Sequence, residues 1–242
     1  MENSSPFLLF GPAHLTVLFL IPLWTVFSIL LARRFGERAT RRFEGANVCI
    51  TALGLGIQQT FRISRGYWDP RWDLPMQLCD WAFIALAAAF ITRRKIFYDL
   101  SYYWGLAGTL QGTLTPALDV GFPHIKFIYF FLFHAGIVSG TIFNAVAGKR
   151  NPGPGSVLRV FLISQIYAAA AMPVNFLLHA NYGFLMEKPS GASLMDFFGP
   201  WPWYILALEI AGFIFFLLLY LPWFLKRKIL GFTGRRDPTP PD

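Results

Sequence analysis

Seven apolar segments divide the chain, and several are long enough to cross a membrane as helices. About 20 residues of α-helix are needed to span the ~30 Å hydrocarbon core of a bilayer. The pattern therefore predicts an all-α, polytopic membrane protein with seven transmembrane helices, in a single domain at residues 1–228. The predicted spans are His14–Ala32, Asn47–Phe61, Leu74–Thr92, Phe97–Pro116, Phe127–Ala147, Val157–His179 and Trp201–Leu225.

Polar side chains interrupt these segments, and they share one half of the membrane if the spans alternate in direction. Ionisable groups at membrane depth are costly and usually face a protein interior or a water-filled cavity. We therefore expect one polar pocket inside the bundle. Its predicted members are Gln58, Gln59, Arg62, Gln77, Cys79, Asp80, Gln111, His134, Asn175, His179 and Glu209.

The charge distribution predicts the orientation. Sixteen of the 21 lysines and arginines fall on the side reached after spans one, three, five and seven. The positive-inside rule then places the N-terminus outside and the C-terminus in the cytoplasm, so the polar pocket opens outward. These basic residues are expected to lie beside anionic lipid, and no nucleic-acid partner is expected. The opposite side holds Arg62, Arg65, Arg71, Lys126 and Lys188.

Several functions lack sequence support. The chain has no CxxC, HExxH, P-loop or GxGxxG motif, so no metal, nucleotide or other cofactor is expected. Span seven has no lysine, which excludes a retinal Schiff base. Cys49 and Cys79 are predicted at different depths and therefore unbonded. Residues 229–242 predict a disordered cytoplasmic tail, and the sequence leaves the oligomeric state open.

Glycines at helical spacing predict where helices approach one another closely. Gly105, Gly108 and Gly112 lie at this spacing in span four, and Gly136 and Gly140 lie one turn apart in span five. Small residues let neighbouring helix backbones come together in a membrane. We interpret these positions as packing surfaces and not as ligand contacts.

Cys79 and His134 form the pair that fits catalysis. Spans three and five run in the same direction, and both residues are expected roughly 7–12 Å from the outer interface at 1.5 Å per residue. A neighbouring histidine can take the thiol proton, and the resulting thiolate attacks acyl carbonyls. The alternative is that Cys79 is a small core residue and that His134 only hydrogen-bonds to a neighbouring helix.

The other polar side chains fit two interpretations. Gln77 shares a helix face with Asp80, and Gln58 shares one with Arg62. Glu209 needs a partner in a low-dielectric setting, and Arg62 is the nearest cation in depth. These groups either bind a phosphate headgroup or an oxyanion, or they form a network that locks the bundle together. The predicted substrate-binding residues are Gln58, Arg62, Gln77, Asp80, Gln111, Asn175, His179 and Glu209.

Two predicted outer loops, residues 62–74 and 181–203, are dense in aromatic side chains. One interpretation is an ordered lid over the polar pocket. The other is an aromatic belt at the membrane interface, where Trp201 and Trp203 are suited to the boundary between lipid and water.

Several motifs resemble a family of bacterial integral membrane proteins called YwaF-like. They are Leu-Pro-Met-Gln-Leu-Cys-Asp at Leu74–Asp80, Tyr-Trp-Gly-Leu-Ala-Gly-Thr-Leu-Gln at Tyr103–Gln111, and Gly-Pro-Trp-Pro-Trp-Tyr at Gly199–Tyr204. The resemblance covers nearly the whole chain. It implies a multi-pass protein of the bacterial cytoplasmic membrane.

That family is distantly similar to the eukaryotic transmembrane protein 164 group. The similarity implies a cofactor-independent acyltransferase or esterase that acts on membrane phospholipid, with His134 as the base. The cysteine of the group lies in a Pro-Cys-His pattern, which aligns either with Cys79 or with Met76; in the second case the nucleophile is displaced by one helical turn or missing. The alternative function is a non-enzymatic lipid-binding or transport protein, in which the polar cluster is a ligand site or a structural network.

Overall fold

The structure of the chain, a computed structural model, describes residues 5–189 and 194–232. Within these residues the regular elements are helices, and the only strand-like pairing is an isolated bridge between Pro6 and Val120. The all-α prediction is therefore confirmed for this part of the chain. The elements are α1 (Pro12–Phe35), α2 (Glu37–Ser64), α3 (Leu78–Thr92), α4 (Lys95–Trp104), the π-helix η1 (Gly105–Thr109), α5 (Leu110–Leu114), α6 (Ile125–Val146), α7 (Ser156–Leu178), the short 3-10 helices η2 (Tyr182–Phe184) and η3 (Leu194–Phe198), and α8 (Trp203–Phe232).

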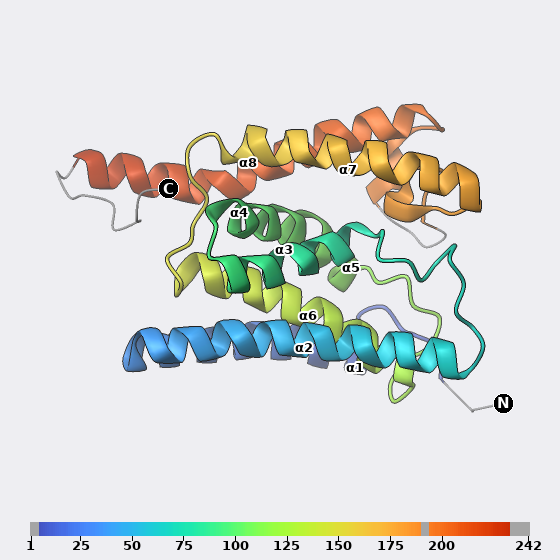
Figure 1. The fold of residues 1–242 in the computed structure, drawn as a ribbon, viewed down its shortest axis with the longest axis horizontal. Coiled ribbons are helices and arrows are strands. Elements are labelled where there is room, and N and C mark those ends of the chain that lie inside the picture. The colour runs from blue at the N-terminus through green and yellow to red at the C-terminus, as the bar shows by residue number, and fades with distance from the viewer. Residues whose placement is uncertain (1–4, 190–193, 233–242) are drawn as a thin grey trace.

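The helices run back and forth along one long axis (Figure 1). Helices α1 and α2 form one side, α7 and α8 form the other, and α3 to α6 lie between them. Helix α4, η1 and α5 follow one another without a break and make a single rod, residues 95–114. The N-terminus lies at the opposite end of the bundle from the α1–α2 turn and from the end of α8.

Four of the helices are long and apolar enough to cross a membrane. They are α1, α6, α7 and the Trp203–Ile229 part of α8. Helix α3 is also apolar but has only 15 residues, which is about 22 Å of helix. Helix α2 has 28 residues, and its ends are rich in charged and polar side chains.

Local chemistry explains the helix ends that differ from the predicted spans. Helix α2 begins at Glu37, well before the predicted Asn47, because Gly36 with φ 74° turns the chain directly from α1 into α2. Helix α3 begins at Leu78 and not at the predicted Leu74. Asp80 accepts a hydrogen bond from the Gln77 backbone N–H at 2.9 Å and fixes the helix start there. The predicted tail is helical as far as Phe232, and residues 233–242 lie outside the described residues.

Helix α6 is the centre of the bundle. In its apolar stretch 61% of the residues are buried, against 17% in α7 and 11% in α8. The predicted close packing at Gly136 is confirmed, because a Cβ there would lie 2.8 Å from the Thr51 backbone nitrogen on α2. On the other side of α6, Ile137 belongs to a buried cluster with Tyr103 and Phe216.

Candidate functional site

His134 lies on the face of α6 that meets the rod of η1 and α5. Its Nδ1 is 2.8 Å from the Phe130 carbonyl oxygen. Because a carbonyl can only accept, Nδ1 carries the hydrogen and Nε2 of the neutral ring keeps its lone pair. A Cβ at Gly112 would lie 3.5 Å from Nε2, so the basic nitrogen lies beside a glycine of α5. The residue is only 8% exposed. Its ring hydrogen bond runs within α6, so it is not the bond to a neighbouring helix that the alternative interpretation described.

Cys79 is the second residue of α3 and is half-buried. It packs against the core cluster that contains Phe133, the residue before His134. Among the described residues no hydrogen bond joins the Cys79 thiol to the His134 imidazole. Both cysteines are free, as predicted, and Cys49 on α2 is exposed. Cys79 therefore packs beside the residue that precedes His134, and the thiol and the imidazole share no hydrogen bond.

The π-helix η1 and the following turn contact both the start of α3 and the His134 ring. A Cβ at Gly108 would lie 3.0 Å from Leu78, the first residue of α3. The rod therefore contacts the start of α3 at Gly108 and the His134 ring at Gly112. Thr109, one turn before Gly112, is buried, and its hydroxyl has no hydrogen-bond partner among the described residues. Single π-turns inside α-helices occur frequently at functional sites. No sequence pattern indicated Thr109 beyond the glycines around it.

The side chains of Gln77 and Asp80 form hydrogen bonds to nearby backbone groups. The Asp80 carboxylate caps the start of α3, and Gln77 Oε1 accepts a hydrogen bond from the Gly183 N–H at 3.1 Å. The Tyr167 hydroxyl on α7 donates to the Met76 carbonyl at 2.9 Å. The first turn of α3 is thus tied to α7 and to the segment that follows it.

Arg62 folds the α2–α3 loop onto the end of α2. Its Nε forms an ion pair with Asp73, and its Nη2 donates to the Tyr67 carbonyl at 2.9 Å. The expected Arg62–Glu209 pair is wrong. Glu209 on α8 accepts a hydrogen bond from Gln165 on α7 at 2.5 Å, because these two helices lie side by side and α2 is across the bundle.

Asn175 and Tyr182 join the two predicted outer loops. The Asn175 side chain is buried, donates to the Tyr182 carbonyl at 2.9 Å and accepts from its N–H at 2.7 Å. The Tyr182 hydroxyl donates to the Pro70 carbonyl at 2.7 Å and accepts from the Leu74 N–H at 3.1 Å. The two loops therefore form one hydrogen-bonded unit at this end of the bundle, which we call the lid.

The remaining predicted site residues make fewer contacts through their side chains. Gln58 on α2 is half-buried, Gln111 on α5 is exposed, and His179 is exposed at the end of α7 with φ 52°. Within the described ranges none of the three side chains hydrogen-bonds to another residue. The lid and its hydrogen bonds to the start of α3 therefore include four predicted site residues, Arg62, Gln77, Asp80 and Asn175. His134 lies apart from them and contacts the η1–α5 rod.

His14 is a buried histidine that sequence reasoning treated only as the start of span one. It is 1% exposed, accepts the Phe10 N–H at Nδ1 and donates from Nε2 to the Thr113 carbonyl at 3.0 Å. It therefore links the start of α1 to the end of α5, next to Gly112. A histidine at the polar edge of an apolar run was the signal available for it.

A second polar cluster lies at the opposite, basic end of the bundle. The Arg93 guanidinium donates to Glu44 at 2.5 Å and to the Tyr98 hydroxyl at 2.9 Å. Lys95 donates to Asp99 at 3.0 Å. These bonds tie the α3–α4 turn to α2, so this end is held by structural ion pairs.

In the α2–α3 loop the charges are arranged in an exposed pair. The Arg71 side chain donates hydrogen bonds to Asp69, and these hold the pKa of the Asp69 carboxyl below its ordinary value. The pair therefore keeps Asp69, on the surface of the lid, ionised to a lower pH than an unpaired carboxyl.

Comparison with known proteins supports the membrane assignment. A model of the TMEM164 family matches residues 9–220. A protein of Treponema pallidum (strain Nichols), described as uncharacterized, is 27% identical over 226 residues, which cover 92% of each chain. No solved structure matches the chain. The finer resemblance to YwaF-like proteins stays a prediction. With most of its length matched by the family model and its long apolar helices, this chain is a membrane protein and belongs to the TMEM164 family.

Proposed function

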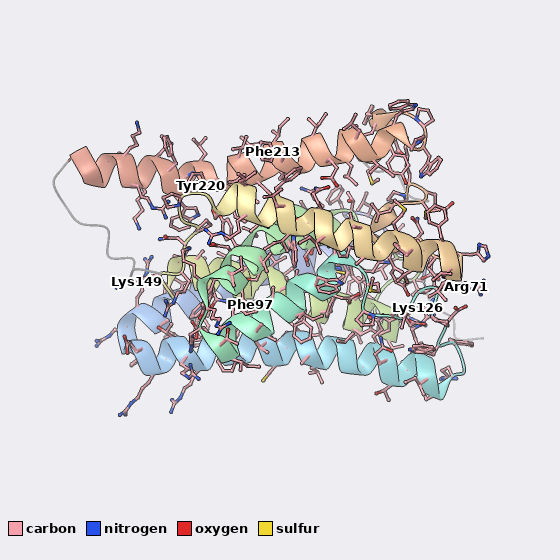
Figure 2. The ribbon with its side chains drawn as sticks, turned by 45° about the horizontal axis from the view of Figure 1, so that its top comes forward. Arg71, Phe97, Lys126, Lys149, Phe213 and Tyr220 are labelled. Atoms are coloured by element: carbon pink, nitrogen blue, oxygen red, sulfur yellow. The ribbon has the colours of Figure 1, made fainter. Side chains whose placement is uncertain are left out.

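We propose that the chain crosses a bacterial cytoplasmic membrane seven times, with the N-terminus outside and the C-terminus inside. The alternating helical rods support this topology, with α2, α3 and the α4–η1–α5 rod as the three spans that are short or polar at their ends. Figure 2 shows Lys149 at one end of the bundle and Arg71 and Lys126 at the other. The bacterial relative supports the compartment. The excess of basic residues at the Lys149 end then marks the cytoplasmic side.

We infer that the protein transfers or hydrolyses phospholipid acyl groups, with His134 as the base. The observation that carries this inference is the His134 ring, whose Nδ1 donates to the Phe130 carbonyl and whose Nε2 lies beside Gly112. A histidine in this tautomer is prepared to accept a proton at Nε2. The buried Thr109 hydroxyl, one turn away, is a donor suited to an oxyanion.

Cys79 is the proposed nucleophile. Its Sγ attacks the acyl carbonyl of a phospholipid, and the thiol proton passes to His134 Nε2. The alkoxide of the lysolipid leaves with that proton, and the acyl group stays on sulfur as a thioester. An acceptor alcohol, or water in the esterase case, then attacks the thioester and regenerates the thiol. Hydrogen bonds between catalytic groups are often long without substrate and tighten when it binds, so the present separation is compatible with this route.

A non-enzymatic, lipid-binding function is the second candidate. It is favoured because most of the predicted substrate-binding residues already bond to other groups of the protein. Arg62, Gln77, Asp80, Asn175 and Glu209 all hydrogen-bond or pair with protein groups, as expected of a network that locks the bundle. In this case Cys79 is a core residue and binding of lipid does not depend on its thiol.

Thiol reactivity toward a lipid probe separates the two functions. The purified protein is treated near neutral pH with a phospholipid that carries a chloroacetamide on its acyl chain, and labelled peptides are quantified. Cys49 is the internal control because it is exposed and a merely accessible thiol would label there first. An active pair concentrates the label on Cys79 and loses it in His134→Ala. Leu217→Ala, at an exposed residue of α8, is the control and leaves labelling unchanged.

Turnover completes the test. Phospholipid vesicles are incubated with wild type, Cys79→Ser and His134→Ala, and the lipids are analysed by mass spectrometry. Lysolipid and acyl-exchanged product should form only with wild type, while wild type and both variants elute as folded protein. Equal labelling of the two cysteines, or turnover that survives Cys79→Ser, would show that the thiol is not the nucleophile.

A further inference from the structure

A half-open cavity of about 490 Å³ lies between α1, α2 and α6. Its walls include Leu20 and Trp24 from α1, Ile50 from α2, and Phe131, Ala135 and Ser139 from α6. None of the predicted site residues lines it. Its volume falls in the range of about 300–1,000 Å³ that is usual for small-molecule sites.

The wall of this cavity offers hydrocarbon contacts almost exclusively. The lining contains no charged side chain. The Thr16 hydroxyl donates to the Pro12 carbonyl of its own helix at 2.8 Å, and the Trp24 indole donates to Asn47 at 2.9 Å. Both groups are therefore satisfied without a ligand. The Ser139 hydroxyl is buried and has no hydrogen-bond partner among the described residues, which makes it the one polar group open to an occupant.

The length and direction of the cavity fit one leaflet of a bilayer. Along α6 it extends from Phe127 to Ser139, which corresponds to about 18 Å of helix at 1.5 Å per residue. One leaflet contributes half of the ~30 Å hydrocarbon core, or about 15 Å. Leu20 lines the cavity and is also 50% exposed beside Phe19 and Leu23, so the cavity opens sideways where α1 meets lipid.

We propose that this cavity is a binding site for one fatty acyl chain of a membrane phospholipid. The chain lies along α6, with its ester end near Phe122 and Phe127 and its methyl end near Trp24 and Ser139. The apolar lining, the sideways opening to lipid and the leaflet-sized length all match this occupant and leave no place inside for a charged headgroup. The proposal does not rest on catalysis by Cys79, because the cavity and His134 lie on different faces of α6.

Photo-cross-linking tests the site. The purified full-length protein is reconstituted in vesicles of phosphatidylethanolamine and phosphatidylglycerol that contain a small share of phospholipid with a diazirine near the end of one acyl chain. After irradiation, cross-linked peptides are mapped. Label should be several-fold higher on residues 16–24 of α1 and 127–139 of α6 than on Leu217 and Leu218 of α8, which are exposed apolar residues outside the cavity.

Two cavity-filling variants and one matched control sharpen the result. Ala135→Trp and Ala13→Phe add bulk to the cavity from opposite walls and should each remove most of the cavity label while the α8 label stays. Ala170→Trp, at an exposed alanine of α7, should change neither. Each variant is first checked for a wild-type elution profile, and the second filling variant serves if the first does not fold.

Three outcomes would overturn the proposal. Equal labelling of the cavity and α8 would mean ordinary surrounding lipid, and labelling that survives both filling variants would place the probe elsewhere. Because a hydrocarbon chain accepts no hydrogen bond, Ser139→Ala should leave the label unchanged. A selective loss in this variant would mean that the occupant carries a polar acceptor. Cavity labelling that persists in Cys79→Ala separates this proposal from failure of the proposed catalysis.

Discussion

The contact between α2 and α6 differs from the contact between α7 and α8. The first is made at backbone level: a Cβ on Gly54 would lie 2.5 Å from the Phe133 nitrogen, and one on Gly136 would lie 2.2 Å from the Thr51 hydroxyl. The second rests on side chains, with the Gln165–Glu209 hydrogen bond and rings of Phe161 and Phe213 whose centroids are 5.0 Å apart. Gly212 of α8 has no atom within 4 Å of an added Cβ.

The difference shows two ways of holding helices together in lipid. Since lipid tails are as apolar as leucine, burial of apolar surface does not drive helix association there. Close backbone packing and interhelical hydrogen bonds must supply the stability instead. Helices α2 and α6 use the first, and α7 and α8 use the second. The central pair should therefore tolerate no added atom, and the peripheral pair should depend on a single polar contact.

The largest expected effect comes from one methyl group in the central contact. Gly136→Ala places a Cβ against the Thr51 hydroxyl and against backbone atoms of Thr51 and Asn47 that cannot move without shifting α2. We expect a loss of at least the ~3 kcal/mol at the upper end of overpacking costs, measured as the free energy of unfolding in mixed micelles. Gly212→Ala is the matched control and should unfold like wild type. Comparable losses in the two variants would mean that the central contact is not special.

The second prediction concerns the lid, which links the two regions. Tyr182 follows α7, and its hydroxyl bonds to Pro70 and Leu74 of the loop after α2. Tyr182→Phe removes the partner of the Pro70 carbonyl and of the Leu74 N–H, two part-buried hydrogen bonds worth about 0.5–1.5 kcal/mol each. Hydrogen exchange should become faster in the lid and α7 while α2 and α6 keep their protection. Faster exchange throughout the bundle would show that the regions unfold as one unit.

The elements that the sequence could predict follow from composition along the chain. Apolar runs located the helices, and the arginines located the basic end. Gly136 was recognisable as a packing position because small residues have a known use between helices. The partners of Arg62 and Glu209 were not predictable in the same way. Depth along a helix says how far a residue lies from the membrane surface, but it does not say which neighbour lies beside it or whether a loop folds back.

The same argument applies to the candidate site. The tautomer and direction of His134 depend on the Phe130 carbonyl and on Gly112, which lie on its own helix and on the neighbouring rod. A one-dimensional pattern contains neither relation. Gln77 and Asp80, by contrast, stand three residues apart at a helix start, which is the spacing of a capping box. That local reason for their positions was available from the sequence.

The third prediction tests the polar contact of the peripheral pair. Gln165→Leu removes the amide that donates to Glu209 and leaves the carboxylate without its bond. Double-mutant cycles of such bonds in membranes give about 0.6 kcal/mol on average and at most about 1.7 kcal/mol. We expect a coupling in that range between Gln165→Leu and Glu209→Leu. A coupling near zero would leave the aromatic contact as the main link between α7 and α8.

The smallest effect is expected at the exposed Asp69–Arg71 pair on the lid. The hydrogen bonds from Arg71 lower the pKa of Asp69 in the folded loop, while the unfolded value is about 3.9. The folded state therefore gains stability above the unfolded pKa, and this gain is lost as the pH falls through the lower, folded pKa. An NMR titration of the Asp69 carboxyl carbon should give a pKa below the ordinary value in wild type, and Arg71→Gln should return it toward that value. Because the pair is exposed and lies far from the α2–α6 contact, Asp69→Asn should lower the stability at neutral pH only slightly. A clear change there would mean that the lid, and not the glycine contact, limits the stability of the bundle.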